Sequence, residues 1–227
     1  VRIGDADKNG KWFAVFASGP TGPVNTTYHQ FMGSSDQSLK IFVLDLLSGP
    51  KSSYTTIDTG IANAFGGFVT NSVIDVDRGS PGSASAYTDD AVYVGYTRKD
   101  GTAWTKGGVL RVLTKGDTNP NNWSVSKLID NTGPVTAGLT KMQDRKSGKL
   151  WVYFGTGRYY YRLNDGTLLD DPDNQQAFYG VQEPCYNPAL NTLDGSCTTA
   201  VSASDLAAGS SSALPSSALG WYINFPA

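Results

Sequence analysis

Short apolar runs recur along the chain, and segments rich in turn residues separate them. The runs WFAVFA (12–17) and LKIFVL (39–44) are typical. No segment keeps the helical period of hydrophobic positions over several turns, whereas short runs rich in β-branched and aromatic residues between turns indicate strands. The predicted strands are residues 12–17, 39–44, 54–58, 69–75, 91–97, 108–113, 123–129, 135–142, 150–154, 177–181 and 221–225.

Two pairs of these strands resemble each other, which indicates an internal repeat. WFAVFASG at residues 12–19 matches WVYFGTG at 151–157, and LKIFVLD at 39–45 matches GVLRVLT at 108–114. A recurring unit of four antiparallel strands is typical of a β-propeller blade. We therefore predict an all-β fold that is part of a β-propeller, with about three four-stranded blades. Propellers usually have four to eight blades, so we expect another segment or chain to complete this one. A β-sandwich is the alternative.

The composition excludes several functions. The chain has one histidine, His29, and one glutamate, Glu183, so it cannot build a zinc site from several histidines. A Ser-His-Asp triad would depend on His29, and a glycosidase with paired carboxylates would have to use Asp. No apolar run of 18 residues exists that could span a membrane as a helix. The formal net charge of −2 argues against a nucleic-acid-binding protein.

The C-terminal third differs in charge from the rest of the chain. All 18 Lys and Arg lie at or before Arg162, whereas residues 163–227 carry only acidic charges. Cys185 and Cys197 lie in this part, and their spacing does not fit zinc or redox motifs. We predict that they form a disulfide in an insertion around residues 163–219, which implies an oxidising compartment; two buried free thiols are the alternative. Residues 199–219 form either a flexible excursion or a short helix beginning near Ser204.

One motif resembles a known family. Residues 149–159 read KLWVYFGTGRY, which is similar to the signature of PilY1-type proteins, the tip-associated factors of bacterial type IV pili. Other stretches fit this family in sequence order: residues 10–16, 39–49, 73–77, 90–95, 133–137, 176–180 and 220–223. The resemblance covers most of the chain. It implies that residues 1–227 are a C-terminal portion of a quinoprotein-like β-propeller.

The resemblance also implies a function. Such a protein is not an enzyme; it is extracellular, lies at or near the pilus tip, and supports pilus assembly, adhesion and surface sensing. The expected partners are minor pilins or the remaining PilY1-like polypeptide, and a start at Val1 leads us to expect a piece of a longer protein. Two alternatives stay open: a quinoprotein-type dehydrogenase that uses a quinone cofactor (PQQ) with calcium, and a structural repeat segment of a large surface protein.

The family carries a calcium loop of the form Asp-x-Asp-x-Asp-Gly followed by a further Asp. Asp75 and Asp77 match the first two positions, Gly79 occupies the third, and Asp90 matches the last. Calcium needs six to eight hard oxygen ligands, which clustered carboxylates supply. The resemblance thus implies a calcium site at Asp75, Asp77 and Asp90. The alternative is a long turn whose Asp side chains cap backbone N–H groups.

A second candidate calcium site lies near the N-terminus. Asp5, Asp7 and Asn9, followed by Gly10, match the opening of an EF-hand loop. The twelfth position holds Phe16 instead of an acid, so only the short form of such a loop fits; a plain turn is the alternative. The acidic run at residues 170–173 (DDPD) is a further place for a cation.

Overall fold

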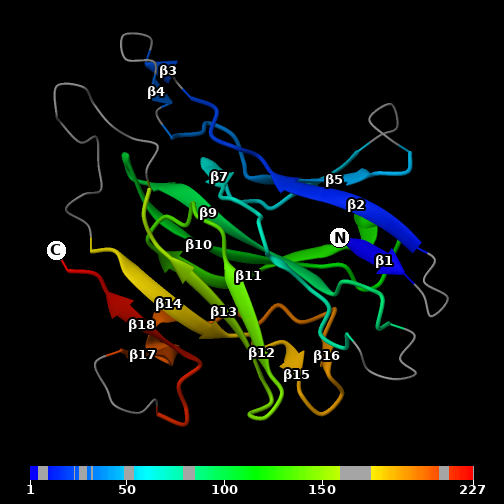
Figure 1. The fold of residues 1–227 in the computed structure, drawn as a ribbon. Coiled ribbons are helices and arrows are strands. Elements are labelled where there is room, and N and C mark those ends of the chain that lie inside the picture. Colours follow the sequence, from blue (N-terminus) through cyan, green and yellow to red (C-terminus); the bar gives the residue numbers. More distant parts are fainter. Residues whose placement is uncertain are drawn as a thin grey trace.

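The computed structural model describes residues 1–4, 10–22, 24–25, 30–31, 33–48, 54–78, 85–158, 175–209 and 215–226. Three sheets follow one another along the chain, and we call them the first, second and third blades (Figure 1). Their strands pair antiparallel, apart from one parallel pair at the edge of the third. The first blade has the order β1-β2-β5-β6, with bounds Arg2–Gly4, Gly10–Ala17, Lys40–Asp45 and Thr55–Asp58.

The other two blades have five strands each. The second blade has the order β11-β10-β9-β7, with β8 also paired to β9. Its bounds are Ala64–Gly66 (β7), Val73–Ile74 (β8), Ala91–Asp100 (β9), Ala103–Leu113 (β10) and Ser124–Thr132 (β11). The third blade has the order β12-β13-β14-β18-β17. Its bounds are Thr140–Asp144 (β12), Lys149–Gly155 (β13), Ala177–Gln182 (β14), Leu206–Ala208 (β17) and Gly220–Asn224 (β18).

The second blade lies between the other two and is buried on both faces. Alternate residues of a strand point to opposite faces of its sheet. Val92 and Val94 of β9 accordingly belong to a core cluster shared with the first blade, whereas Tyr93 belongs to a cluster shared with the third. The three sheets are therefore stacked in series, as blades of a propeller are, and do not form a two-sheet sandwich. The predicted all-β fold with about three blades is confirmed.

The internal repeat corresponds to equivalent strands. The runs at residues 12–19 and 151–157 overlap β2 and β13, each the second strand of its blade. The runs at 39–45 and 108–114 overlap β5 and β10, each the third strand when the second blade is counted from β7. The remaining described elements are small: the pairs β3–β4 (Val24–Asn25, Gln30–Phe31) and β15–β16 (Tyr186–Asn187, Thr192–Leu193), and the 3-10 helices η1 (Pro120–Asn122) and η2 (Ala203–Asp205).

Over most of two predicted ranges the chain forms no strand. Within residues 69–75 only β8 is a strand, because Asn71 adopts a positive φ of 58° and turns the chain. Within 135–142 the strand β12 begins only at Thr140, because the N–H of Val135 donates to Tyr96 O at 3.2 Å and the segment crosses to the second blade. Strand β7 was not predicted at all, since three residues that include a glycine give no periodic signal.

The disulfide-bearing excursion lies between β14 and β18. Cys185 and Cys197 are disulfide-bonded, with their Cα atoms 5.7 Å apart. A short 3-10 helix, η2, follows, and Ser202 and Asp205 form a capping box at its start. No helix among the described residues is long and apolar enough to cross a membrane.

Candidate metal centre

Three of the predicted ligands come together at one end of the second blade. β8 and β9 pair as antiparallel strands, with Ile74 opposite Ala91. The residues just beyond this pairing are Asp75 and Asp90, which are therefore neighbours, and Asp77 follows two residues later. One carboxylate oxygen from each of the three lies within 4.8 Å of the others.

Backbone and side-chain hydrogen bonds fix this arrangement. The N–H of Val76 donates to Asp90 Oδ2 at 2.7 Å, and the N–H of Asp90 donates to Ile74 O at 2.7 Å. The Ser85 hydroxyl donates to Asp77 Oδ2 at 2.5 Å. Asp77 is buried, and Asp75 Oδ1 is a buried oxygen for which the described residues supply no hydrogen-bond donor.

Side chains from the third blade and the turn after β12 hydrogen-bond to the backbone of residues 76–78. Gln143 Nε2, from β12, donates to Val76 O at 2.7 Å and also contacts Asn191 Oδ1 at 2.6 Å. Arg145 donates to Arg78 O at 2.9 Å, and the Arg78 side chain itself is exposed. Sequence reasoning missed Ser85 and Gln143; Gln143 lies 67 residues from Val76, and no motif marks it.

The cluster holds excess negative charge. Burial, the hydrogen bond with Asp77 and the negative charge of Asp77 together raise the pKa of Asp75 to about 7, and burial is the largest cause. Burial likewise raises the pKa of Asp90 to about 6, although the hydrogen bond from Val76 opposes this. Among the described residues, no Lys or Arg forms an ion pair with Asp75 or Asp90.

These features fit a hard divalent cation. Calcium binds oxygens at about 2.3–2.6 Å, so oxygens on opposite sides of one ion lie about 5 Å apart. Three oxygens within 4.8 Å of one another can therefore contact a single ion. The unpartnered Asp75 Oδ1 is available as a ligand, and a cation would offset the repulsion that raises both pKa values. Calcium binding at this cluster stays a prediction.

The other predicted cation sites lie outside the described part of the chain. Asp5, Asp7 and Asn9 fall in residues 5–9, and the acidic run falls in 159–174. His29 is outside it as well.

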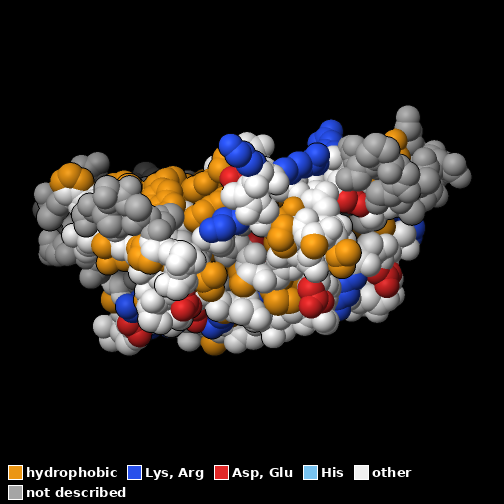
Figure 2. Space-filling model, turned by 90° about the horizontal axis from the view of Figure 1, so that it is seen from below, with side chains coloured by type: hydrophobic (Ala, Val, Ile, Leu, Met, Phe, Trp, Pro, Cys, Tyr) orange, Lys and Arg blue, Asp and Glu red, His pale blue; other side chains and the backbone are white. Residues whose placement is uncertain are grey.

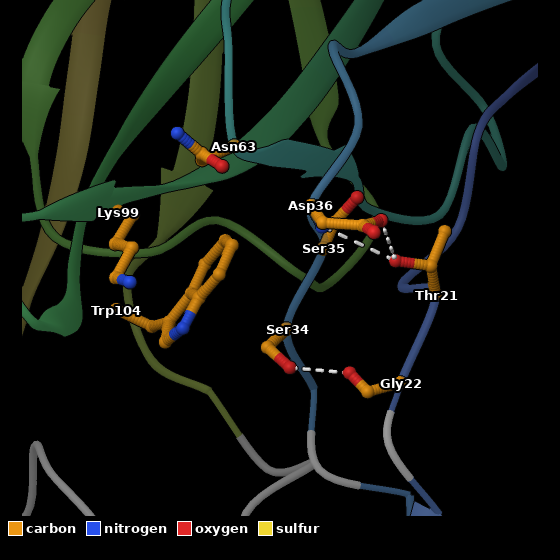
Figure 3. A pocket seen from close by; sticks show the side chains of 8 residues that line it. All are labelled: Thr21, Gly22, Ser34, Ser35, Asp36, Asn63, Lys99 and Trp104. Carbon is orange, nitrogen blue, oxygen red and sulfur yellow. Dashed lines mark hydrogen bonds between the residues drawn. The ribbon is translucent and has the colours of Figure 1, made fainter.

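A separate pocket of about 380 Å³ lies where the connection from β2 to β5 meets the second blade. Figure 3 shows the side chains that line it: Thr21, Gly22, Ser34, Ser35, Asp36, Asn63, Lys99 and Trp104. Thr21 Oγ1 donates to Asp36 Oδ1 at 3.0 Å. Trp104 packs against Phe65 and is only 9% exposed, so it offers little ring surface to a ligand. The carboxylate cluster is the stronger candidate.

We compared the chain with known proteins in sequence and in structure. No family model matches the sequence, and no curated protein matches it. The stacked blades define a β-propeller-type structure. The crystal structure of the Pseudomonas aeruginosa PilY1 C-terminal domain is similar, with a TM-score of 0.50 and 15% sequence identity. The match covers 83% of this chain and 45% of that one, so this chain spans less than half of the PilY1 domain. The predicted resemblance to PilY1-type proteins is confirmed as a likeness of fold.

Proposed function

We propose that this chain is a segment of an extracellular, pilus-associated β-propeller that binds calcium and has no catalytic role. The propeller fold shared with the PilY1 C-terminal domain supports the class of protein. The disulfide between Cys185 and Cys197 fits a protein of an oxidising compartment. Asp75, Asp77 and Asp90 would hold the ion.

The observation that carries the calcium proposal is the position of the three carboxylates. They lie where β8 meets β9, at the start of a strand that belongs to both core clusters. An ion bound there would fix the β8–β9 connection to the blade. The role of the ion is therefore structural: it would order the loop and the surface that this loop forms.

Calorimetric titration with Ca²⁺ tests this site. We expect the metal-free chain to bind one ion with a dissociation constant of about 10⁻⁴–10⁻³ M, as extracellular calcium modules do. The double variant Asp75→Asn, Asp77→Asn should lose this binding, because it removes two charged ligands and keeps the side-chain size. Asp194→Asn is the control, since Asp194 caps an exposed turn far along the chain. Binding that survives the double variant would refute the assignment to this cluster.

Binding to purified minor pilins tests the association with pili. We expect the chain to bind them, and more tightly with calcium than with a chelator present. The dehydrogenase alternative predicts instead a change in cofactor absorbance when PQQ and calcium are added. No binding to any minor pilin would favour the alternative of a structural repeat segment.

A further inference from the structure

The polar pocket beside the connection from β2 to β5 has two walls, and hydrogen bonds hold both in place. One wall is built from two segments of this connection. The N–H groups of Thr21 and Gly22 both donate to Ser34 O, at 2.8 and 3.2 Å, so these segments run side by side. Gly22 and Gly33 adopt positive φ angles of 123° and 58°, which let the connection turn back on itself. The backbone alone therefore fixes the shape of this wall.

The opposite wall belongs to the second blade. The N–H of Lys99, on β9, donates to Asn63 O at 3.0 Å, which holds the residue before β7 beside the end of β9. Trp104, on β10, packs against Phe65 with ring centroids 5.7 Å apart, and its carbonyl accepts from Arg158 Nη1 at 3.2 Å. This wall is thus also formed without a ligand.

The pocket places opposite charges on facing walls. Figure 3 shows Lys99 on one side, Asp36 and Thr21 on the other, and Asn63 above and between them. Hydrogen bonds from Gln37 and Thr21 lower the pKa of Asp36, so its carboxylate is ionised at neutral pH. In the part of the chain that the structure describes, neither Asp36 nor Lys99 forms an ion pair. Both charges are therefore available to a ligand.

The hydrogen-bonding groups that remain for a ligand are of both kinds. Asp36 Oδ2 accepts no hydrogen bond from the described residues. The Lys99 ammonium can donate and the Asn63 amide can do both, and neither side chain has a hydrogen-bond partner among the described residues. The pocket therefore suits a ligand whose own groups both donate and accept.

This lining is unsuited to an apolar ligand. Trp104 is the one large hydrophobic side chain among the described residues that line the pocket, and it is almost buried. The large exposed hydrophobic side chains that the structure describes lie outside the pocket. Seen from below, hydrophobic side chains gather on the left of the molecule, the side on which Figure 1 places β14 and β18 (Figure 2). A ligand in the pocket would therefore be bound mainly by hydrogen bonds.

We propose that this pocket binds one neutral sugar residue of a glycan. Hydroxyl groups both donate and accept, so neighbouring hydroxyls of one ring can donate to Asp36 and accept from Lys99 and Asn63. A ligand with a net charge of either sign would be attracted by one wall and repelled by the other. The volume of about 380 Å³ is near the lower limit of small-molecule sites, about 300 Å³, which suits a single ring. Sugar binding here is independent of the calcium site and of pilus binding.

Saturation-transfer NMR with the methyl glycosides of glucose, mannose, galactose and N-acetylglucosamine tests the proposal. We expect at least one of the four to bind residues 1–227 with a dissociation constant of about 1 mM, because a single ring held by polar groups gains little from burial. A calcium chelator should leave this binding unchanged, since none of the three clustered carboxylates lines the pocket.

Two substitutions locate the site. Asp36→Asn can still accept from Thr21 but loses the charged acceptor, and Lys99→Met loses the donor. Each should weaken binding about tenfold, because hydrogen bonds to charged groups are the strong ones. The matched controls are Asp58→Asn, which changes an exposed carboxylate after β6, and Lys146→Met, which changes an exposed lysine after β12. Neither control residue lines the pocket, so both variants should bind the sugar as the wild type does. All four substituted side chains are exposed, so the melting temperatures should stay close to that of the wild type.

Three results would overturn the proposal. The first is the absence of a signal from all four glycosides. Binding that persists undiminished in both Asp36→Asn and Lys99→Met would place the sugar elsewhere on the chain. Binding of alanine, a zwitterionic probe, or of N-acetylneuraminate, an anionic sugar, in place of the neutral glycosides would show that the pocket recognises charge and not hydroxyl groups.

Discussion

The guanidinium of Arg111 and the carboxylate of Glu183 form an ion pair whose side chains are completely buried. Arg111 lies on β10 of the second blade, and Glu183 directly follows β14 of the third. Tyr93 OH donates to Glu183 Oε2 at 2.8 Å, and Arg111 also donates to Thr199 O at 2.9 Å. The only glutamate of the chain thus joins two blades through their shared core.

Glu183→Gln should strongly destabilise the chain. The variant keeps the size of the side chain but leaves the Arg111 charge buried without its partner, which typically costs about 3–5 kcal/mol. Urea unfolding followed by tryptophan fluorescence measures the change. The double variant Arg111→Met, Glu183→Leu should recover most of the loss, since an apolar pair removes both charges.

A surface pair provides the control. Lys127→Met removes one of the two basic partners of Asp130, Arg98 being the other. The lysine side chain is 42% exposed, so the loss should be less than about 1 kcal/mol. If Glu183→Gln costs no more than this, the buried pair does not hold the blades together.

The disulfide should act together with this ion pair. The Cys185 N–H donates to Glu183 Oε1 at 2.9 Å, and Thr199, two residues after Cys197, accepts from Arg111. Replacing both cysteines by serine should cost about 2–4 kcal/mol. In a double-mutant cycle with Glu183→Gln, the combined variant should lose about 0.5–3 kcal/mol less stability than the sum of the two separate losses. Strict additivity would show that the disulfide loop does not position the pair.

The fold was predictable where its signal is local. The β8–β9 connection brings Asp75 and Asp90 together over a short stretch, so their spacing and the family resemblance were enough to group them. Arg111 was predicted within a strand, but its partner lies 72 residues away, and nothing in the local pattern links the two.

Exposure was not predictable from the same pattern. Residues 12–17 are apolar at every position, which is typical of a strand buried on both faces. Trp12 is nevertheless 57% exposed, because burial depends on which sheet packs against that face. Sequence periodicity gives the face on which a residue lies, and only the arrangement of blades shows whether that face is covered.

Gly180→Ala should disturb the aromatic layer that Tyr153, Phe178 and Trp221 form on the third blade. The added methyl would lie 2.5 Å from the Trp221 ring, so the indole must move, at a cost of about 1–3 kcal/mol. Thermal unfolding and tryptophan emission, compared with the wild type, measure the effect. Gly155→Ala is the matched control: it lies on the same blade, and its nearest neighbour atom, on Phe178, would be 4.0 Å away. Equal stability of the two variants would contradict the packing described here.

The stability of the metal-free chain should fall as the pH rises from about 4 to about 7. In the folded chain the pKa of Asp75 is about 7 and that of Asp90 about 6, because of burial, whereas an unfolded aspartate has a pKa of about 3.9. Between these values the folded state binds more protons than the unfolded state, so deprotonation favours unfolding. Melting temperatures of chelator-treated protein at several pH values measure this trend.

Asp75→Asn isolates the contribution of the cluster from that of other carboxylates, since it removes the group with the higher pKa. As the pH rises, the melting temperature of the wild type should fall relative to that of the variant. Saturating calcium should reverse this trend, because the ion competes with protons for the same oxygens and binds best once they are lost. The gain in stability from calcium should therefore be larger at pH 8 than at pH 5. A gain that does not depend on pH would place the ion elsewhere, since carboxylates with ordinary pKa values are already ionised at pH 5.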